Sequence, residues 1–373
     1  MNVVIIGNGP AGNNIASKLD AEGVKVDLYS DEEVSFYSRI RLPSCIGNKD
    51  KLYSLCAQNE PSYIHHEAVV AIHRESKTIL LADGHSKHYD KLVIATGSNP
   101  LVFFNNSGLE GIYTLRNFCD AIKITDDLIS PICIMGGGLL GLETALEINK
   151  LNHKVTVVQG DAYVLNKQLN EEGAKIVSDK CEERENLDII SNQFAKSVEG
   201  DKRIKKLVLQ NGTELECNTL ILAAGVKPSV ALAKGCGLEI SKAIVINEYC
   251  QTSDKSIYAV GDCAEFNNEC PGLLPIALAT ANVCYNHILG KKIPYVAPTQ
   301  LPTRFQADDL LVASFGELRG ECHSKRVEDR YEAWYIEDKK VAGVILIGSK
   351  SHLPLAKASL NKEVEDVNVL LDF

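Results

Sequence analysis

The chain has 373 residues, of which 45% are hydrophobic and 24% charged, a composition typical of a folded globular protein rather than a disordered or collagen-like chain. Lys and Arg total 39 against 49 Asp and Glu, so the formal net charge is −10 at pH 7, and no long block of like charge concentrates it. An acidic chain without a basic stripe is a poor candidate for binding nucleic acid or an anionic membrane. At roughly 150 residues per domain, the length predicts two or three domains.

Twelve cysteines are the unusual feature of the composition. None forms a C-x-x-C pair and no Cys/His cluster has the paired spacing of a structural zinc site, so we predict no bound metal. The first apolar run, residues 3–6, has no basic region before it, and no apolar run approaches the roughly 20 residues that cross a bilayer. We therefore expect a cytoplasmic protein with reduced thiols and neither a signal peptide nor a membrane span.

The chain opens with a pattern typical of a buried strand, a glycine turn and a helix. The apolar run 3–6 is followed by Gly7, Gly9 and Gly12, and a second strand is expected over 24–29. In such a turn the first glycine makes the tight bend, the second lets the backbone approach a pyrophosphate, and the third lets helix and strand pack closely. The start of the helix adds free N–H groups, so the segment predicts a dinucleotide-binding βαβ unit.

The same plan recurs in the second third of the chain. A buried strand over 131–135 leads into Gly136, Gly138 and Gly141, and a helix and a strand over 155–158 follow. Each copy continues through a hairpin to a strand that ends in Ala-Thr-Gly or Ala-Ala-Gly. We interpret this repeat as two nucleotide-binding units with parallel sheets, which is an α/β fold.

The residue at the end of the second strand of such a unit often holds a ribose hydroxyl. In the first copy this residue is Ser30, with Asp31 next to it, and either is a candidate. In the second copy it is Gln159, with Asp161 two residues further on, and no Lys or Arg lies between 155 and 165. A site without a cation for a 2′-phosphate favours NADH over NADPH.

A third element combines an apolar strand over 257–260 with Gly261 and Asp262, ahead of an expected helix. The carboxylate of Asp262 is suited to accept a hydrogen bond from a ribityl hydroxyl, and a helix cap is the plainer alternative. From about residue 296 onward, strand patterns followed by a helix predict a small α+β domain.

Five motifs occur in an order and spacing that resemble the FAD- and pyridine nucleotide-dependent disulfide oxidoreductase superfamily: GNGPAG, KLVIATG, IMGGGLLGLE, LILAAGVKP and IYAVGDCAE. The chain is most similar to the NADH:rubredoxin oxidoreductases of that superfamily, through VVIIGNGPAG, FYSRIRL, YTLRNFCDAIKI and YAVGDCAEF. The resemblance implies two Rossmann-like domains of the glutathione-reductase type and a small α+β C-terminal domain. The expected domains are 1–108 with 226–295 for FAD, 109–225 for NAD(H), and 296–373.

The resemblance also implies site residues. The predicted FAD contacts are Gly7, Gly9, Pro10, Ala11, Gly12, Ser30, Asp31, Arg39, Val69, Ala95, Thr96, Gly97 and Asp262. The predicted NAD contacts are Gly136, Gly138, Leu139, Leu140, Gly141, Glu143, Gln159 and Gly225. Val69 would lie against the adenine, Arg39 near the flavin, and Glu143 near both nicotinamide and flavin. We take Arg39 and Glu143 as the catalytic residues. The plain alternatives are a solvated arginine and a carboxylate on a helix surface.

One departure from the superfamily decides the expected chemistry. Members that use thiols carry C-x-x-x-x-C, or a single cysteine in an S-F-x-x-C setting, over the flavin. Here Ser35-Phe36-Tyr37-Ser38 is followed by Arg39. Cys45 comes six residues later and has no second cysteine at the required spacing. We therefore predict a flavin without a neighbouring redox thiol.

The resulting hypothesis is an FAD-dependent NADH oxidoreductase, a monomer or homodimer, that passes hydride to the flavin and single electrons to a small iron protein, with rubredoxin as the favoured acceptor. NADPH is the less favoured donor. One alternative is an NADH oxidase or peroxidase, or a CoA-disulfide reductase, that uses Cys45. The others are a flavoprotein related to nitrite reductase and a non-enzymatic sensor or scaffold that binds FAD and NADH.

Overall fold

The computed structural model describes the whole chain except residues 104–107, 299–301, 308–309, 365 and 372–373. The described residues fall into two compact units, each made of separate stretches of the chain. Unit 1 comprises residues 1–40, 50–99 and 226–298, and unit 2 comprises residues 41–49, 100–225 and 299–373. The finer division into three domains stays a prediction.

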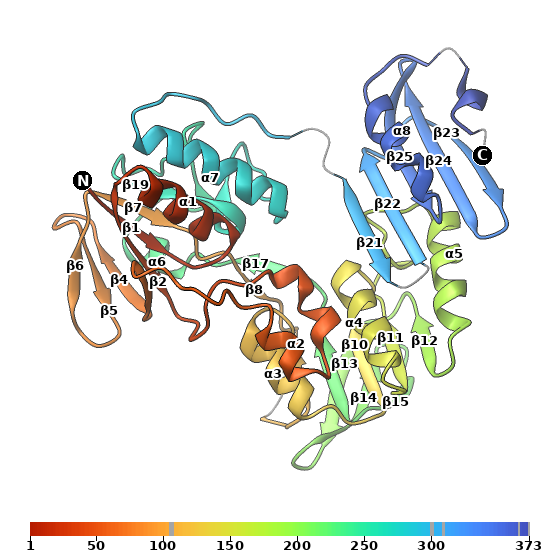
Figure 1. Cartoon of the computed structure of the whole chain (residues 1–373). Coiled ribbons are helices and arrows are strands. Elements are labelled where there is room, and N and C mark those ends of the chain that lie inside the picture. The colour runs from red at the N-terminus through yellow and green to blue at the C-terminus, as the bar shows by residue number, and fades with distance from the viewer. Residues whose placement is uncertain (104–107, 299–301, 308–309, 365, 372–373) are drawn as a thin grey trace. The chain divides into compact units, whose positions relative to one another are not determined.

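Unit 1 is built on a five-stranded parallel sheet with the order β19-β7-β1-β2-β3 (Figure 1). Its strands are β1 (Asn2–Ile6), β2 (Lys25–Ser30), β3 (Ile64–His66), β7 (Lys91–Ile94) and β19 (Ile257–Ala259). Val3, Val4 and Ile5 in the central strand have no exposed surface. Such uninterrupted apolar runs are typical of a parallel sheet that is covered on both faces.

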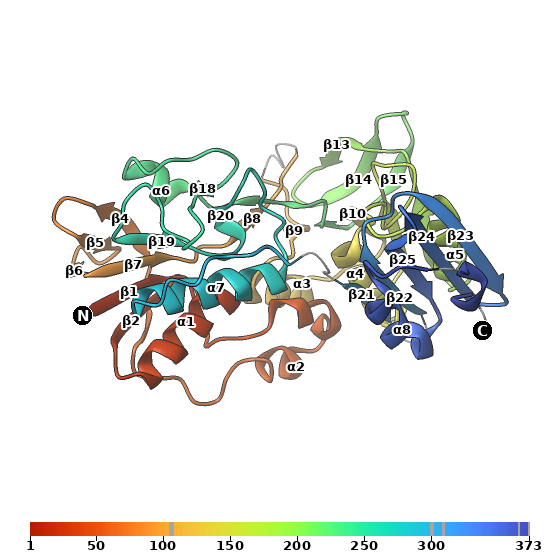
Figure 2. The same cartoon turned by 90° about the horizontal axis from the view of Figure 1, so that it is seen from above.

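Helices α1 (Pro10–Ala21) and α7 (Leu274–Ile288) lie side by side in unit 1, as the two views in Figures 1 and 2 show. Ala16 on α1 and Ala281 on α7 are both completely buried. Small side chains let two helices approach closely, which explains the small-residue composition of α7. The other elements that lie wholly or mostly in unit 1 are η1 (Arg39–Arg41), α2 (Lys49–Tyr53), β4 (Val69–His73), β5 (Thr78–Leu81), β6 (Ser86–His88), β8 (Ser98–Pro100), β17 (Val226–Pro228), α6 (Ala231–Gly235), β18 (Ile244–Val245), η3 (Gly261–Cys263) and β20 (Ala264–Glu265).

Unit 2 contains a second five-stranded parallel sheet, with the order β12-β11-β10-β16-β9. Its strands are β9 (Ile112–Thr114), β10 (Ile132–Met135), β11 (Val155–Val158), β12 (Leu187–Ile190) and β16 (Thr219–Leu222). The helices are α3 (Phe118–Asp126), α4 (Leu139–Asn149) and α5 (Glu171–Glu182), and β13 (Ala195–Gly200), β14 (Ile204–Leu209) and β15 (Glu214–Glu216) form a small antiparallel sheet. The strand, glycine turn, helix and strand predicted as a repeat are present in both units.

The C-terminal part of unit 2 is an antiparallel sheet with the order β21-β22-β25-β24-β23. Its elements are β21 (Thr303–Ala307), β22 (Leu310–Gly316), β23 (Glu321–Val327), β24 (Arg330–Glu337), β25 (Lys340–Ile347), η4 (Lys350–His352), α8 (Leu353–Ser359) and η5 (Val367–Val369). This sheet is tied to α5 and the residue before it, since Asn170 Nδ2 donates to the Tyr331 hydroxyl at 2.8 Å and Lys180 pairs with Asp329 at 2.9 Å. Trp334, the single tryptophan, has no exposed surface.

The predicted fold class is confirmed, with two parallel-sheet cores and a C-terminal antiparallel sheet. The sequence pattern did not indicate β23, because its side chains are largely polar and exposed, as an edge strand allows. The helix rich in small residues that the sequence predicts over 276–289 is present as α7, and η3 and β20 lie between it and Asp262. Among the described residues, no helix is long and apolar enough to cross a membrane.

Candidate functional site

Several predicted segments meet at the carboxyl edge of the parallel sheet in unit 1. Because the strands are parallel, their carboxyl ends lie at one edge, and the register aligns Ile6 with both Tyr29 and Ile94, and Ile94 with Ala259. The predicted residues at this edge are Gly7 after β1, Ser30 at the end of β2, Ala95, Thr96 and Gly97 after β7, and Asp262 after β19. Val69 stands apart as the first residue of β4, packed against the core of unit 1.

The three glycines after β1 differ in what surrounds them. Gly7 has a φ of +110°, and a Cβ on it would lie 2.3 Å from the carbonyl oxygen of Ala95. A Cβ on Gly12 would lie 2.0 Å from the carbonyl oxygen of Gly7. A Cβ on Gly9 would meet no atom within 4 Å. Gly7 and Gly12 are therefore required by the close packing of strand and helix, whereas Gly9 borders open space.

Helix α1 begins at this open space. Its N-cap residue Gly9 provides no side-chain hydrogen bond to the first turn, which contains Pro10 and Ala11. The buried amide nitrogen Nδ2 of Asn8 also has no hydrogen-bond partner in the described part of the chain. Unsatisfied N–H groups at a helix N-terminus favour an anion. The space and the donors fit the pyrophosphate of a dinucleotide.

Asp262 is held in place by hydrogen bonds from its neighbours. Its Oδ2 accepts from the hydroxyl of the buried Ser98 at 2.9 Å, and its carbonyl oxygen accepts from the thiol of Cys270 at 3.2 Å. Thr96, also at this edge, donates its hydroxyl to the carbonyl oxygen of Ser229 at 2.9 Å. Asp262 lies in the short turn η3 rather than ahead of a regular helix, so it does not serve as the cap of α7.

The end of β2 is organised by Glu32, a residue that the sequence analysis did not select. Asp31 is exposed, and Ser30 Oγ accepts a hydrogen bond from the Glu32 backbone N–H at 3.2 Å. The Glu32 carboxylate accepts from the Tyr37 hydroxyl at 2.5 Å and forms an ion pair with Arg39. Arg39 is therefore a partly buried, ion-paired arginine rather than a solvated one. The position of Glu32, about 20 residues after the glycine turn, is the signal that would have found it.

The carboxyl edge of the parallel sheet in unit 2 repeats this geometry. Gly136 has a φ of +115°, and a Cβ on it would lie 2.6 Å from the carbonyl oxygen of Ala223. A Cβ on Gly141 would lie 1.8 Å from the carbonyl oxygen of Gly136, and one on Gly138 would meet no atom within 4 Å. Helix α4 begins directly afterwards, without a side-chain cap. Its first residues are Leu139 and Leu140, and Gly225 closes the turn after β16.

The side-chain amide of Gln159, at the end of β11, already has two protein partners. Its Oε1 accepts from the backbone N–H of Gly137 at 2.7 Å, and its Nε2 donates to Asp161 Oδ2 at 3.1 Å. Asn166 Nδ2 also donates to Asp161 Oδ2, at 2.9 Å. Gln159 thus ties the glycine turn to Asp161 and orients that exposed carboxylate. Asp161 is the better placed residue to accept a hydrogen bond from a ribose hydroxyl.

An exposed aromatic ring lies beside this carboxylate. A Cβ on Gly160 would come within 2.2 Å of Cε1 of Phe194, so the ring covers this glycine. Phe194 nevertheless leaves 52% of its surface exposed. Its loop is fixed to β11 by a hydrogen bond from the Gln193 N–H to the Gln159 carbonyl oxygen. An exposed flat ring is suited to stacking with a base, and no sequence motif indicated this residue.

Glu143 lies in the first turns of α4 in a mostly buried position. Burial raises the pKa of its carboxyl to about 7, and the negative charge of Glu147 acts in the same direction. Helix α4 packs against β21 and against η2 (Pro43–Cys45). A carboxyl with this perturbation is a candidate functional group, unlike a solvated carboxylate on a helix surface.

The cysteines do not form a redox pair in this structure. All twelve cysteines are free. Cys45, the cysteine nearest in sequence to the position expected beside the flavin, Arg39, has no exposed surface. Cys133 and Cys263 are buried in the two sheet cores. A thiol without exposed surface cannot meet an external disulfide or peroxide, which weighs against chemistry at Cys45.

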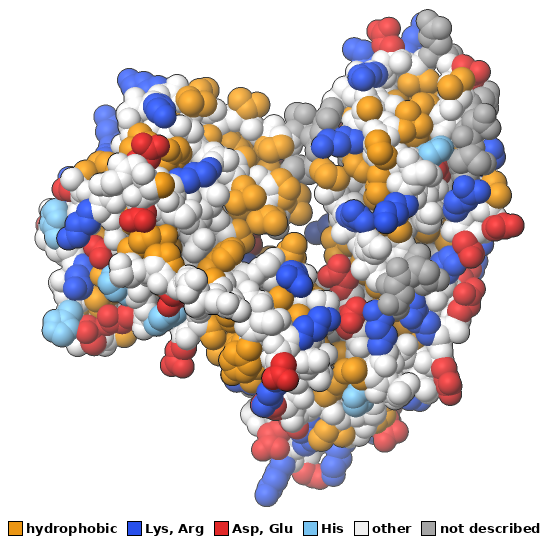
Figure 3. All heavy atoms as spheres, viewed as in Figure 1, with side chains coloured by type: hydrophobic (Ala, Val, Ile, Leu, Met, Phe, Trp, Pro, Cys, Tyr) orange, Lys and Arg blue, Asp and Glu red, His pale blue; other side chains and the backbone are white. Residues whose placement is uncertain are grey.

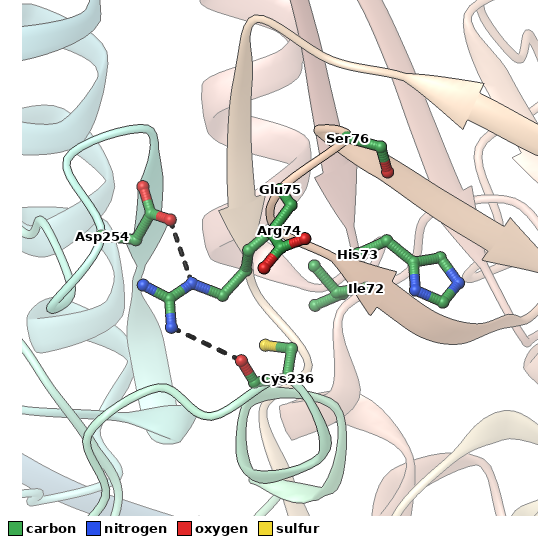
Figure 4. A pocket seen from close by; sticks show the side chains of 7 residues that line it. All are labelled: Ile72, His73, Arg74, Glu75, Ser76, Cys236 and Asp254. Carbon is green, nitrogen blue, oxygen red and sulfur yellow. Dashed lines mark hydrogen bonds and ion pairs between the residues drawn. The ribbon is translucent and has the colours of Figure 1, made fainter.

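A pocket of about 730 Å³ lies elsewhere in unit 1 (Figure 4). Arg74 crosses it, with Nε 3.0 Å from Asp254 Oδ2 and a hydrogen bond from NH1 to the carbonyl oxygen of Cys236. Asp254 precedes β19, so the pocket adjoins the amino edge of the sheet, opposite the glycine turn. None of the residues predicted to bind FAD or NAD lines it.

Comparison with known proteins identifies the family. The model of the pyridine nucleotide-disulphide oxidoreductase family matches residues 1–281. The chain belongs to this family. The predicted superfamily is confirmed, and FAD and NADH are the cofactors with which the family and its rubredoxin reductases work, so the cofactor prediction is confirmed as well.

The relatives include two kinds of electron-transfer protein. The chain is 30% identical to rubredoxin-NAD(+) reductase of Pseudomonas putida, over 83% of this chain and 84% of that protein. It is 27% identical to the assimilatory nitrate reductase electron transfer subunit of Bacillus subtilis, over 93% of this chain and 47% of that protein. The chain therefore spans about half the length of the nitrate and nitrite reductase relatives that it matches.

Solved structures show the same fold. Putidaredoxin reductase in its covalent complex with putidaredoxin superimposes with a TM-score of 0.88 at 26% identity, covering 100% of this chain and 95% of that one. NADH:rubredoxin oxidoreductase from Clostridium acetobutylicum gives a TM-score of 0.81 at 24% identity, covering 98% and 97%. The latter similarity supports the fold alone.

The two kinds of glycine in the first turn give a matched test. We expect Gly12→Ala to lower the free energy of unfolding by about 1–3 kcal/mol, because its methyl group would overlap the Gly7 carbonyl oxygen. Gly9→Ala has room for its methyl group, so it should unfold like the wild type but retain less FAD. Urea unfolding and flavin absorbance of the purified proteins measure the two effects. Full FAD content in Gly9→Ala would contradict the assignment of this space to the cofactor.

Proposed function

We propose that the chain is an FAD-dependent NADH oxidoreductase that delivers single electrons to a small iron protein, with rubredoxin as the favoured acceptor. The observation that carries this proposal is a pair of open spaces beside Gly9 and Gly138, each at the carboxyl edge of its own parallel sheet. We call each of these spaces, with the helix N-terminus next to it, a cradle. Arg39 in place of a flavin-adjacent cysteine, together with the complete burial of Cys45, favours a carrier protein over a disulfide as acceptor.

Each cradle has a defined task in this proposal. At the first, the N–H groups at the start of α1 hold the pyrophosphate of FAD, Asp262 accepts a hydrogen bond from its ribityl chain, and Glu32 with Arg39 shapes the flavin side. At the second, the N–H groups at the start of α4 hold the pyrophosphate of NADH, and Asp161 accepts from its adenosine ribose. FAD, when bound, accepts an electron pair as hydride and gives electrons up one at a time.

Glu143 is proposed to tune this exchange. Its carboxyl lies in a mostly buried position on the helix that begins at the NADH cradle, and the burial raises its pKa to about 7. Near neutral pH the group therefore switches between a neutral acid and a carboxylate. A neutral acid does not oppose the negative charge that an electron acceptor gains, whereas a carboxylate does.

A second candidate function is supported by the nitrate and nitrite reductase relatives. They match at least 93% of this chain, although the chain spans about half their length. In that case the chain would supply NADH-derived electrons to a nitrogen oxyanion reductase instead of a free carrier. The cradles and Glu143 would keep the same tasks, and only the acceptor would differ.

The docking face for an acidic carrier is proposed to lie around α4. The face in Figure 3 carries acidic and basic side chains interspersed. A cation without an acidic partner on such a surface is a candidate for binding an acidic protein. Arg41 and Arg304 are exposed, and neither has an ion pair among the described residues. Arg41 ends the short turn η1 (Arg39–Arg41), two residues before η2, and Arg304 lies on β21. Both η2 and β21 pack against α4. Two unpaired cations next to this helix suit an acidic surface.

The acceptor is tested by steady-state turnover with NADH. We expect rubredoxin to be reduced at least about tenfold more efficiently than dioxygen or CoA disulfide, because only a carrier protein can present a charged surface complementary to the docking face. A generic dye serves as the reference for flavin reduction. Equal rates with rubredoxin and the dye would contradict the acceptor. Turnover that requires a thiol would contradict the reaction type.

The docking face is tested by charge reversal. We expect Arg41→Glu and Arg304→Glu each to raise the KM for rubredoxin several-fold at low salt, with a smaller effect at high salt, because exposed charges are screened. Dye reduction should be unchanged. The matched control is Lys196→Glu on β13, also an exposed cation of unit 2. An equal increase in KM for Lys196→Glu would point to net charge rather than to this face.

Glu143 is tested by the pH dependence of NADH-driven dye reduction. Because the pKa is about 7, we expect kcat/KM to be higher on the acid side and to fall as the pH rises through this value. Glu143→Gln should abolish the step. Glu147→Gln should move it to lower pH, because the charge of Glu147 raises the Glu143 pKa. A step that persists unchanged in Glu143→Gln would exclude this group.

A further inference from the structure

His66 is the last residue of β3, at the carboxyl edge of the parallel sheet in unit 1, and lies between two hydrogen-bond acceptors. Its Nδ1 is 2.7 Å from the backbone carbonyl oxygen of Glu32, and its Nε2 is 2.7 Å from Oε2 of Glu60. A carbonyl oxygen and a carboxylate only accept hydrogen bonds. A neutral imidazole carries one N–H and can donate to one of them. Both contacts are satisfied together only by the imidazolium form.

The contact with Glu32 matters because of what Glu32 holds. The Glu32 carboxylate binds the Tyr37 hydroxyl at 2.5 Å and pairs with Arg39. The Arg39 guanidinium also lies over the Tyr37 ring, 5.4 Å from its centroid. The carboxylate side chain of Glu32 is only 14% exposed, so this ion pair is shielded from solvent. The side chain of Glu32 thus pairs with Arg39, while its backbone carbonyl oxygen is bound by His66.

We propose that His66 is a positioning residue for FAD: as an imidazolium, it pins the Glu32 carbonyl and thereby holds the Glu32–Arg39 ion pair at the flavin site. The proposal rests on the assignment of this edge to FAD under the proposed function. Its consequence is that FAD is held less firmly when His66 loses its proton. His66 itself need not touch the cofactor.

The charges around His66 support the imidazolium form. Glu60 precedes β3 and Glu32 and Glu33 follow β2, and the pKa of His66 is raised by the bond to Glu60, the bond to the Glu32 carbonyl and the charge of Glu33, against a smaller opposing effect of burial. Arg39 is the cation of this group and is paired with Glu32. Cys56 also faces Glu32, and burial and that charge raise the pKa of its thiol, so it stays neutral.

The sign of the pH dependence follows from these charges. A histidine whose pKa is raised by folding contributes its stabilisation fully below its ordinary value, near 6.5. The contribution is lost as the pH rises through the raised pKa. Retention of FAD should therefore be strongest in mild acid and weaken above neutrality.

The experiment measures the rate of FAD release from the purified holoenzyme, by the rise of flavin fluorescence, from about pH 5 to about pH 9, a range that spans the titration of histidine. We expect release to speed up by about tenfold across the step, the size of one lost charge-assisted hydrogen bond. His66→Gln should be flat and fast at all pH values, because a neutral amide cannot gain a proton. Glu60→Gln should move the step to lower pH.

His85→Gln is the matched control. His85 is also paired with a carboxylate, Asp83, at 2.6 Å, and its pKa is also raised, but its side chain is 79% exposed and makes no contact with Glu32. It should keep the wild-type profile. A wild-type profile in His66→Gln would overturn the proposal while leaving the flavoenzyme assignment intact. Purified protein that binds no FAD at any pH would overturn the proposed function itself.

Discussion

The structure depends on one steric constraint that occurs twice: a helix must approach the strand before it so closely that no Cβ fits between them. At Gly12 and at Gly141 that atom would lie 2.0 Å and 1.8 Å from the carbonyl oxygen of the glycine that begins the turn. The close approach aims the first N–H groups of each helix at the edge of its sheet. The second glycine of each turn then leaves that edge open. The binding of two dinucleotides follows from packing and not from a charged side chain.

Because this constraint acts within a few residues, the sequence alone was sufficient to predict it. The glycine turns, the parallel sheets and the meeting of Gly7, Thr96 and Asp262 at one edge all follow from local patterns. The carboxylates next to the strand ends do not. Ser30 and Gln159 stand at the expected strand ends, but the nearby side chains of Glu32 and Asp161 are oriented by hydrogen bonds to Tyr37 and to the Gln159 amide. Such partners lie outside any fixed spacing.

The two carboxyl edges differ in the groups that follow the second strand of each repeat. In unit 2 the uncharged amide of Gln159 bonds to both the glycine turn and the Asp161 carboxylate, so the negative charge stands three residues beyond the end of β11. In unit 1 a chain of charges, from Glu60 through His66 and Glu32 to Arg39, occupies the corresponding place. The first arrangement contains no histidine, whereas the second contains His66, whose pKa is raised by its hydrogen bonds to Glu60 and to the Glu32 carbonyl. The complete burial of Cys45 keeps its thiol away from an external disulfide.

The route of the chain has a consequence for how the molecule is made. Unit 1 is assembled from residues 1–40, 50–99 and 226–298, and its strand β19 pairs with β7, far earlier in the sequence. A ribosome therefore releases Gly7 and the first helix long before Asp262 exists. The parallel sheet of unit 2, which lies within residues 100–225, is complete in the nascent chain by then. The edge assigned to FAD is thus the last of the two to close during synthesis, and until then the apolar strand β7 lacks its neighbour β19.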